Sequence, residues 1–199
     1  MPRKYQQKKR AEHQEQTRQQ IIAAAVELIE QVGPTRATIS AIAERAGVER
    51  ATVYRHFPDE QVLLIGCMRH YMVTHPLPDP NRWQQISEPE IRLRIGLSEI
   101  YTYHSQTEQM AVQMMRDLPD LPVLQNALRP YFQHWTRIRD VLGANWNTEG
   151  ELPHLLSAAI GHAIAFQTWH SLVQEQGLGN IQAIELMVAL IRDVLTLFV

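Results

Sequence analysis

Apolar residues recur at spacings of three and four along almost the whole chain, and no segment alternates apolar and polar residues with a period of two. The first pattern is typical of amphipathic helices and the second of strands. We therefore expect an all-α protein. Helices are expected near residues 17–32, 39–46, 49–56, 59–75, 90–105, 107–117, 121–143, 151–176 and 180–198.

The composition places the chain among globular proteins. With 199 residues, of which 45% are hydrophobic and 20% charged, it can bury one ordinary core or two small ones. Its apolar runs are short, so we expect no transmembrane segment, and the polar start through Arg18 does not resemble a secretory signal. A cytoplasmic location is the expectation. Cys67 is the only cysteine, which excludes an internal disulfide and a cysteine-based zinc site.

Residues 38–57 carry the signals of two short helices joined by a tight turn. Thr38 stands where an N-cap belongs, and Gly47 can adopt the left-handed conformation that ends a helix. Ala43 is small enough for two helices to cross there. Apolar anchors for both inner faces are Ile42, Ala46, Val48 and Val53. The pattern predicts a helix-turn-helix, with an ordinary helical hairpin as the alternative.

The residues on the outward face of the second helix of this pair are of types that can contact DNA. An α-helix fits the major groove, where an arginine such as Arg50 can pair with guanine and small side chains can approach a thymine methyl. Tyr54 and His56 can reach phosphate oxygens, as can the amino end of the helix after Thr38. The predicted DNA-binding residues are Thr38, Ser40, Arg50, Ala51, Thr52, Tyr54, Arg55 and His56.

Two stretches, Thr38 to Val48 (TISAIAERAGV) and Ala51 to Pro58 (ATVYRHFP), resemble the signature of the TetR family of regulators. The resemblance covers about residues 17–65. It implies a three-helix DNA-binding domain, a fourth helix leading to a ligand-binding domain, and a homodimer on a roughly palindromic operator. The family commonly has a phosphate-contacting lysine two residues after the Pro58 position, where this chain has Glu60.

We expect three parts along the chain: a basic flexible arm over residues 1–16, the DNA-binding domain over 17–58, and a larger helical domain for ligand sensing and dimerisation over 59–199. Residues 1–60 hold ten Lys/Arg against eight Asp/Glu, whereas residues 61–199 hold nine against thirteen. All three lysines lie in the first ten residues. The arm is either a solvated tail or a clamp on DNA phosphates.

The two carboxy-terminal helices are apolar on more than one side, as helices covered from two directions are. They are expected to form a four-helix interface with the same pair from a second subunit. Central helices of a monomer are the alternative. The predicted interface residues are Ala158, His162, Ala165, Trp169, Met187, Ile191 and Leu195.

A ligand pocket is the second expectation for this half. Large, soft or amphipathic side chains lie on helices expected to surround a cavity, and pockets are typically apolar with a few polar anchors. A plain core is the alternative for the same side chains, and it is the more common role of such stripes. The predicted ligand-binding residues are Tyr101, His104, Met110, Met114, Trp135 and Phe166.

Together these features predict a ligand-responsive transcription regulator, a repressor that binds its operator as a homodimer and is released by a hydrophobic or aromatic effector. A DNA-binding architectural or regulatory protein without a ligand is the alternative. No catalytic motif such as HExxH, a nucleophile elbow or a phosphate-binding glycine loop is present, so we expect no enzyme and no cofactor. His154, His162 and His170 recur every eight residues and do not converge on a metal.

Overall fold

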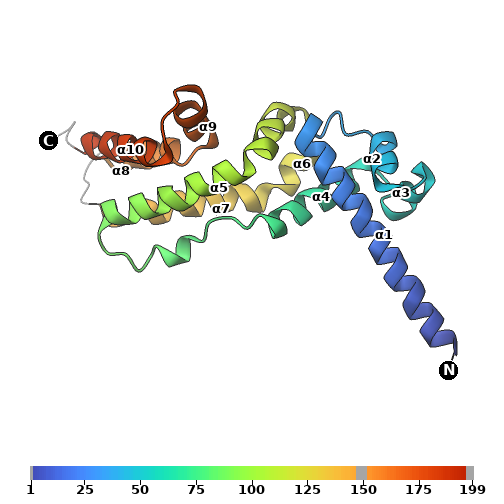
Figure 1. Cartoon of the computed structure of the whole chain (residues 1–199). Coiled ribbons are helices and arrows are strands. Elements are labelled where there is room, and N and C mark those ends of the chain that lie inside the picture. The colour runs from blue at the N-terminus through green and yellow to red at the C-terminus, as the bar shows by residue number, and fades with distance from the viewer. Residues whose placement is uncertain (1, 147–151, 196–199) are drawn as a thin grey trace. The chain divides into compact units, whose positions relative to one another are not determined.

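The computed structural model describes residues 2–146 and 152–195, and every regular element in these two ranges is a helix (Figure 1). The expectation of an all-α fold is confirmed. Among the helices of these ranges, none is both long enough and apolar enough to cross a membrane. The predicted extension of the last helix to residue 198 lies partly outside the described residues.

The chain forms two compact units, and each is built from two separate segments. Residues 1–76 and 109–128 make the amino-terminal unit, and residues 77–108 and 129–199 make the carboxy-terminal unit. This division differs from the expected one after residue 58. The reason is that α4 (Glu60–Thr74) packs against α1 (Pro2–Val32), and α6 (Pro122–Ala127) packs against α4, so both belong to the amino-terminal unit.

Helix α1 begins at Pro2, fifteen residues before the expected start at Thr17. Its second half buries Ile21, Ala25 and Ile29, but residues 5–16 are all exposed. This polar half is helical because Gln, Lys, Arg, Glu and Ala favour helix, and because pairs four residues apart support it, such as Lys8 Nζ with Glu12 Oε1 at 3.8 Å. The expected flexible arm is therefore a helix in the structure.

Helix α5 (Pro89–Asp117) is continuous where two helices were expected, and the chain passes from the carboxy-terminal to the amino-terminal unit within it. Its last residue, Asp117, is only 4% exposed. The carboxylate accepts hydrogen bonds from the Thr35 backbone N (3.1 Å), the Thr35 hydroxyl (2.6 Å) and Arg116 Nε (2.6 Å). Arg116 Nη2 also donates to Val32 O at 2.8 Å. We call this set the Asp117 clasp.

Gly33 is required beside the Asp117 clasp for two reasons. Its φ of +88° lies in the left-handed region, and a Cβ at this position would lie 2.5 Å from Asp117 Oδ2. The clasp therefore holds the α1–α2 connection closely against the end of α5. The hydrogen bonds from Arg116 and Thr35 lower the pKa of Asp117 to about 2.

The carboxy-terminal unit packs helices α7 (Arg129–Leu142), α8 (Leu152–Ala163), α9 (Phe166–His170) and α10 (Asn180–Val194) with the first part of α5 and the short helix η1 (Pro80–Arg82). The core of this unit is apolar. The fully buried members include Leu93, Leu97, Ile100, Ile138, Leu142, Ile160, Ala163 and Trp169.

Two helices expected to be continuous are broken. The segment expected at 121–143 is divided into α6 and α7 at Leu128, where Pro130 follows as the second residue of α7 and cannot continue a preceding helix. The segment expected at 151–176 is divided at residues 164–165 and ends in a π-helical turn, η3 (Ser171–Glu175). Neither break follows from the apolar spacing alone.

Side chains from outside α8 satisfy the carbonyl groups at the second break. Tyr101 OH donates to Ala163 O at 3.1 Å, and His104 Nε2 lies 3.0 Å from Ile164 O. The Thr168 hydroxyl donates to His162 O at 2.6 Å. Because the last carbonyls of a helix have no partner within it, these three side chains stabilise the end of α8.

Replacing Asp117 by Ala is expected to lower the free energy of unfolding by about 2 kcal/mol. The hydrogen bonds to the charged carboxylate are lost, and their donors on Thr35 and Arg116 are left without this acceptor. The exposed Asp120→Ala serves as the matched control. Urea denaturation followed by circular dichroism measures both. Because the pKa of Asp117 is lowered, its contribution is present above about pH 4 and is lost as the pH falls toward 2. Equal stability of the two variants at pH 7 would contradict the role of the clasp.

His104 gives a second test of stability. Burial, opposed by the hydrogen bond with Ile164, lowers its pKa to about 4, so the folded protein keeps it neutral while the unfolded chain protonates it below about pH 6.5. The titration of His104 is therefore expected to lower the free energy of unfolding by about 3 kcal/mol between pH 6.5 and pH 4. His104→Gln, which can still donate to Ile164 O but does not titrate, should flatten the fall. The control His154→Gln, at an exposed histidine, should retain it.

Candidate nucleic-acid interface

The turn between α2 (Ile39–Ala46) and α3 (Arg50–His56) has the geometry that the sequence predicted. The Thr38 hydroxyl accepts a hydrogen bond from Ala41 N at 3.3 Å, and Gly47 has φ +65°. Val48 N donates to Ala43 O at 3.0 Å and Gly47 N to Glu44 O at 3.1 Å. These two bonds are those of a Schellman motif, which ends α2 and turns the chain into α3.

Each helix of this pair buries one side and exposes the other. Ile42 and Ala43 of α2 and Val53 of α3 are buried, and Phe57, directly after α3, is 1% exposed. The helices are thus fixed through their inner faces. On α3 the outer side chains Arg50, Ala51, Tyr54 and Arg55 are exposed.

The predicted DNA-binding residues therefore divide into two groups. Fully available at the surface are Thr38, Ser40, Arg50, Ala51, Tyr54 and Arg55, whereas Thr52 and His56 are half-buried. The Thr52 hydroxyl accepts a hydrogen bond from Arg55 Nη2 at 3.3 Å. Burial and the nearby guanidinium groups of Arg55 and Arg18 lower the pKa of His56, so its imidazole is neutral at pH 7.

Arg18 belongs to this region, although the sequence analysis did not select it. Its guanidinium lies 5.0 Å from the centre of the Phe57 ring, a cation–π contact between α1 and the end of α3. The signal was present in the spacing, because Arg18 precedes Ile22, Ala25 and Ile29 on one stripe of α1.

Glu60 has a local role at the start of α4. Asp59 Oδ1 caps the helix by accepting from Val62 N at 2.8 Å, and Glu60 is the first helical residue. A negative charge in the first turn stabilises a helix through its dipole. The residue therefore supports the helix from the position where the family commonly has a cation.

Four of the six predicted ligand-binding residues lie together in the carboxy-terminal unit. The His104 ring is 5.4 Å from the Trp135 ring and 5.6 Å from the Phe166 ring between centroids, and Tyr101 is 6.4 Å away. Met110 and Met114 belong to the amino-terminal unit instead. The polar atoms of Tyr101 and His104, expected to anchor a ligand, are hydrogen-bonded to the end of α8.

The predicted dimer-interface residues are also divided by burial. Trp169, Met187 and Ile191 are in the core of their own chain, so their expected role at an interface is corrected. Ala158 and His162 on α8 are exposed, and Ala165 and Leu195 are half-buried. Helix α10 instead exposes Leu186 and Leu190, at 40% and 51%.

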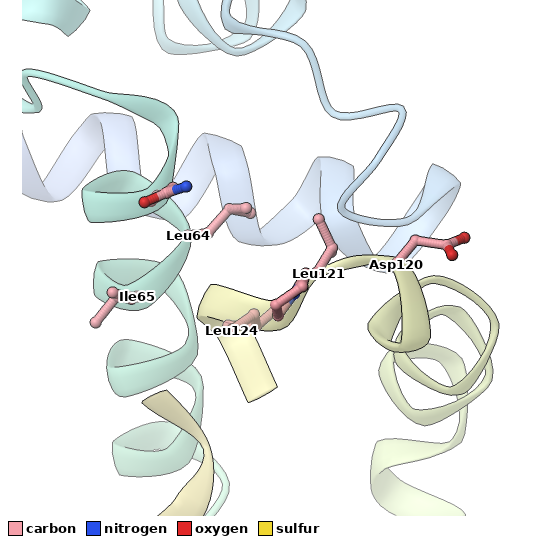
Figure 2. A pocket seen from close by; sticks show the side chains of 7 residues that line it. Leu64, Ile65, Asp120, Leu121 and Leu124 are labelled. Carbon is pink, nitrogen blue, oxygen red and sulfur yellow. The ribbon is translucent and has the colours of Figure 1, made fainter. Parts of the chain in front are cut away.

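The amino-terminal unit contains a small hollow that the sequence analysis did not predict (Figure 2). Its volume is about 150 Å³, and none of the predicted ligand-binding residues lines it. Small-molecule sites are usually larger, about 300 to 1,000 Å³. The lining residues are Gln61, Leu64 and Ile65 of α4, and Asp120, Leu121, Pro122 and Leu124 around the start of α6.

Comparisons with known proteins agree with this geometry. Residues 21–66 match the model of the family described as bacterial regulatory proteins, tetR family. Over 55 residues the chain is 44% identical to the HTH-type transcriptional regulator BetI of Ectopseudomonas mendocina (strain ymp), and over 78 residues it is 35% identical to BetI of Proteus mirabilis (strain HI4320). These matches span 28% and 39% of both the chain and the respective relative.

Solved structures resemble the whole fold. NalD, the secondary repressor of the MexAB-OprM multidrug efflux pump in Pseudomonas aeruginosa, has a TM-score of 0.61 at 21% identity, with coverage of 92% of this chain and 98% of NalD. FadR of Bacillus subtilis, solved with stearoyl-CoA, has a TM-score of 0.60 at 19% identity, with coverage of 87% and 96%.

The fold and the α2–α3 surface define a helix-turn-helix protein with a second helical unit. Its residues 21–66 match the amino-terminal domain of the TetR family of bacterial regulatory proteins, and the rest of the chain resembles such proteins in fold.

Proposed function

We propose that this protein is a ligand-responsive transcriptional regulator, a repressor that binds a palindromic operator as a homodimer. The observation that carries the proposal is the exposed outer face of α3, with Arg50, Ala51 and Tyr54, on a turn held by the Schellman motif at Gly47. The face combines a guanine reader, a small side chain for close approach and a hydroxyl for a phosphate. Cytoplasmic double-stranded DNA is the partner, and no catalytic step is part of the function.

Within this face we assign separate roles. Arg50 reads base edges, and Ala51 and Thr52 allow close approach to the groove floor. Tyr54 and the amino end of α2, with Thr38 and Ser40, bind backbone phosphates and set the register. Arg55 adds a cation at the end of α3, whereas neutral His56 contributes a hydrogen bond and no charge.

A second subunit is proposed to pack on the exposed side of α8 and α10. These two helices contact each other and leave Ala158, His162, Leu186 and Leu190 uncovered. Small and apolar residues of this kind suit a two-fold helical interface, in which the same surface is used by both subunits. A dimer places two recognition helices on the two halves of a palindrome.

The effector is proposed to be a hydrophobic or aromatic molecule bound in the carboxy-terminal unit near Trp135 and Phe166, which are both half-buried. Support comes from the stearoyl-CoA bound to the FadR of B. subtilis, a structure with the same fold. The polar atoms of Tyr101 and His104 are hydrogen-bonded to carbonyl groups at the end of α8. Apolar and ring contacts are therefore proposed to provide most of the binding energy for the effector.

Effector binding is proposed to act on DNA affinity through the helices that lead from one unit to the other. One is α4, which follows α3 directly. The other is α5, whose end holds Thr35 in the Asp117 clasp, three residues before the N-cap Thr38. A change in either helix alters the setting of α2 and α3, and hence the fit of the two subunits to their half-sites.

A DNA-binding protein without an effector is the alternative, and the internal hydrogen bonds of Tyr101 and His104 favour it. The two functions differ in one measurement. Hydrophobic and aromatic compounds that bind the purified protein should weaken its operator binding at least fivefold. Compounds that bind tightly and leave the operator affinity unchanged would support the alternative.

Selection of bound fragments from genomic DNA is expected to recover a palindrome. Arg50→Ala should weaken binding to it by about 1 to 3 kcal/mol and relax the preference at one base in each half-site. Arg69→Ala, at an exposed arginine of α4, is the matched control and should keep that preference. Fluorescence anisotropy with the wild-type and single-base-changed duplexes measures both. An Arg50→Ala variant with unchanged preference would remove Arg50 from the reading face.

Leu190→Arg is expected to convert the dimer to a monomer, because a charge is placed in the centre of the proposed α8–α10 interface. Ile181→Arg is the control, since Ile181 is 78% exposed and lies nine residues earlier, on the opposite side of α10. Analytical ultracentrifugation gives the mass of each, and circular dichroism checks that both remain folded. A dimeric Leu190→Arg protein, or a monomeric Ile181→Arg protein, would place the interface elsewhere.

A further inference from the structure

The amino-terminal half of α1 has no packing role in its own unit. Between Tyr5 and Gln16 every residue is exposed, and the first buried residue after this stretch is Ile21. In Figure 1 this part of α1 continues past α2 and α3 as one helix. We call residues 5–16 the α1 extension. Its helical form is maintained without a core, so its surface is available to a partner.

The charge of this region is strongly positive at the end farthest from the core. Residues 1–10 contain five Lys/Arg and no Asp/Glu, and the first acidic residue is Glu12. Lys8 pairs with Glu12 at 3.8 Å, but both side chains are more than 60% exposed, so the pair neutralises little. A cationic helix of this kind attracts a polyanion.

The α1 extension is continuous with the proposed DNA-binding surface. Arg18, two residues beyond its end, contacts Phe57 at the end of α3. A rotation of about 100° per residue places Gln7, Arg10 and Gln14 within about 80° of Arg18 around the helix. This side carries no carboxylate, because Glu12 and Glu15 lie about 120° and 60° away on the other side of Arg18.

The composition selects one class of partner. Tyr5 and Ala11 are the only apolar side chains between residues 5 and 16, so the extension has no apolar stripe for a membrane surface and no apolar centre for a protein interface. Lys, Arg and Gln side chains are the groups that contact DNA phosphates and sugars.

We propose that the α1 extension binds the sugar-phosphate backbone of the DNA that flanks each half-site. This inference rests on the proposed function, because α3 must first hold the operator. Twelve helical residues span about 18 Å, the length of about five base pairs of B-DNA. The footprint of each subunit therefore reaches about five base pairs beyond the bases read by α3. These contacts add affinity without base preference.

The test compares the wild type with a variant carrying Lys8→Gln, Lys9→Gln and Arg10→Gln. Glutamine removes the charge and retains helix propensity. Affinity for the selected operator is measured over a salt series, on a duplex with ten flanking base pairs at each side and on one cut at the half-site edges. The control variant carries Arg69→Gln, Arg129→Gln and Arg192→Gln, which removes the same charge from exposed positions elsewhere.

The wild type and the control should bind the long duplex at least tenfold more tightly than the short one. The variant is expected to bind both equally, with the same base preference as the wild type. Its slope of log K against log salt should be less steep by about one per subunit, since Arg10 is the mutated cation on the Arg18 side of the helix and each lost phosphate contact removes about 0.9. Helix content by circular dichroism should be unchanged.

Different failures are distinguishable. If the wild type binds the operator and the variant keeps both the salt slope and the dependence on flank length, the α1 extension does not bind DNA and the proposed function stands. If the wild type binds anionic lipid vesicles and the variant does not, while the DNA binding of the variant is unchanged, the α1 extension binds a membrane surface and the inference is overturned. If the wild type selects no genomic sequence, it is the proposed function that fails.

Discussion

The left-handed conformation of Gly47 is the constraint on which the proposed DNA-binding surface depends. It allows Val48 and Gly47 to return hydrogen bonds to Ala43 and Glu44, so α2 ends within one residue and α3 begins at a fixed angle. A residue with a Cβ is strained at this φ, and the angle between the helices would change. The inner contacts of Val53 and Phe57, and thus the orientation of the outer face of α3, follow from this one backbone geometry.

Local signals predicted the amino-terminal unit well. The cap at Thr38 and the turn at Gly47 depend on neighbours within about five residues, and both are found as predicted. The apolar pattern does not predict the extent of α1, because residues 5–16 have almost no apolar side chains. Helix propensity and charge pairs are sufficient to hold residues 5–16 in a helix without burial.

The carboxy-terminal unit was harder to predict because its breaks and buried faces depend on residues far away in sequence. The end of α8 is stabilised by Tyr101 and His104, about sixty residues earlier, and no local pattern reports such partners. On α10 both Leu190 and Ile191 are apolar, and only packing decides that Ile191 is buried and Leu190 exposed. The proposed interface and ligand site thus required the structure as well as the pattern.

The division of the amino-terminal unit into two segments has a consequence for its synthesis. Residues 1–76 contain the helix-turn-helix, but the unit is completed only by residues 109–128, which carry the Asp117 clasp and α6. At roughly 5 to 20 residues per second, the ribosome needs several seconds to pass from one segment to the other. During this interval the nascent helix-turn-helix lacks part of its packing. The amino-terminal unit is complete only after more than half of the chain has been made.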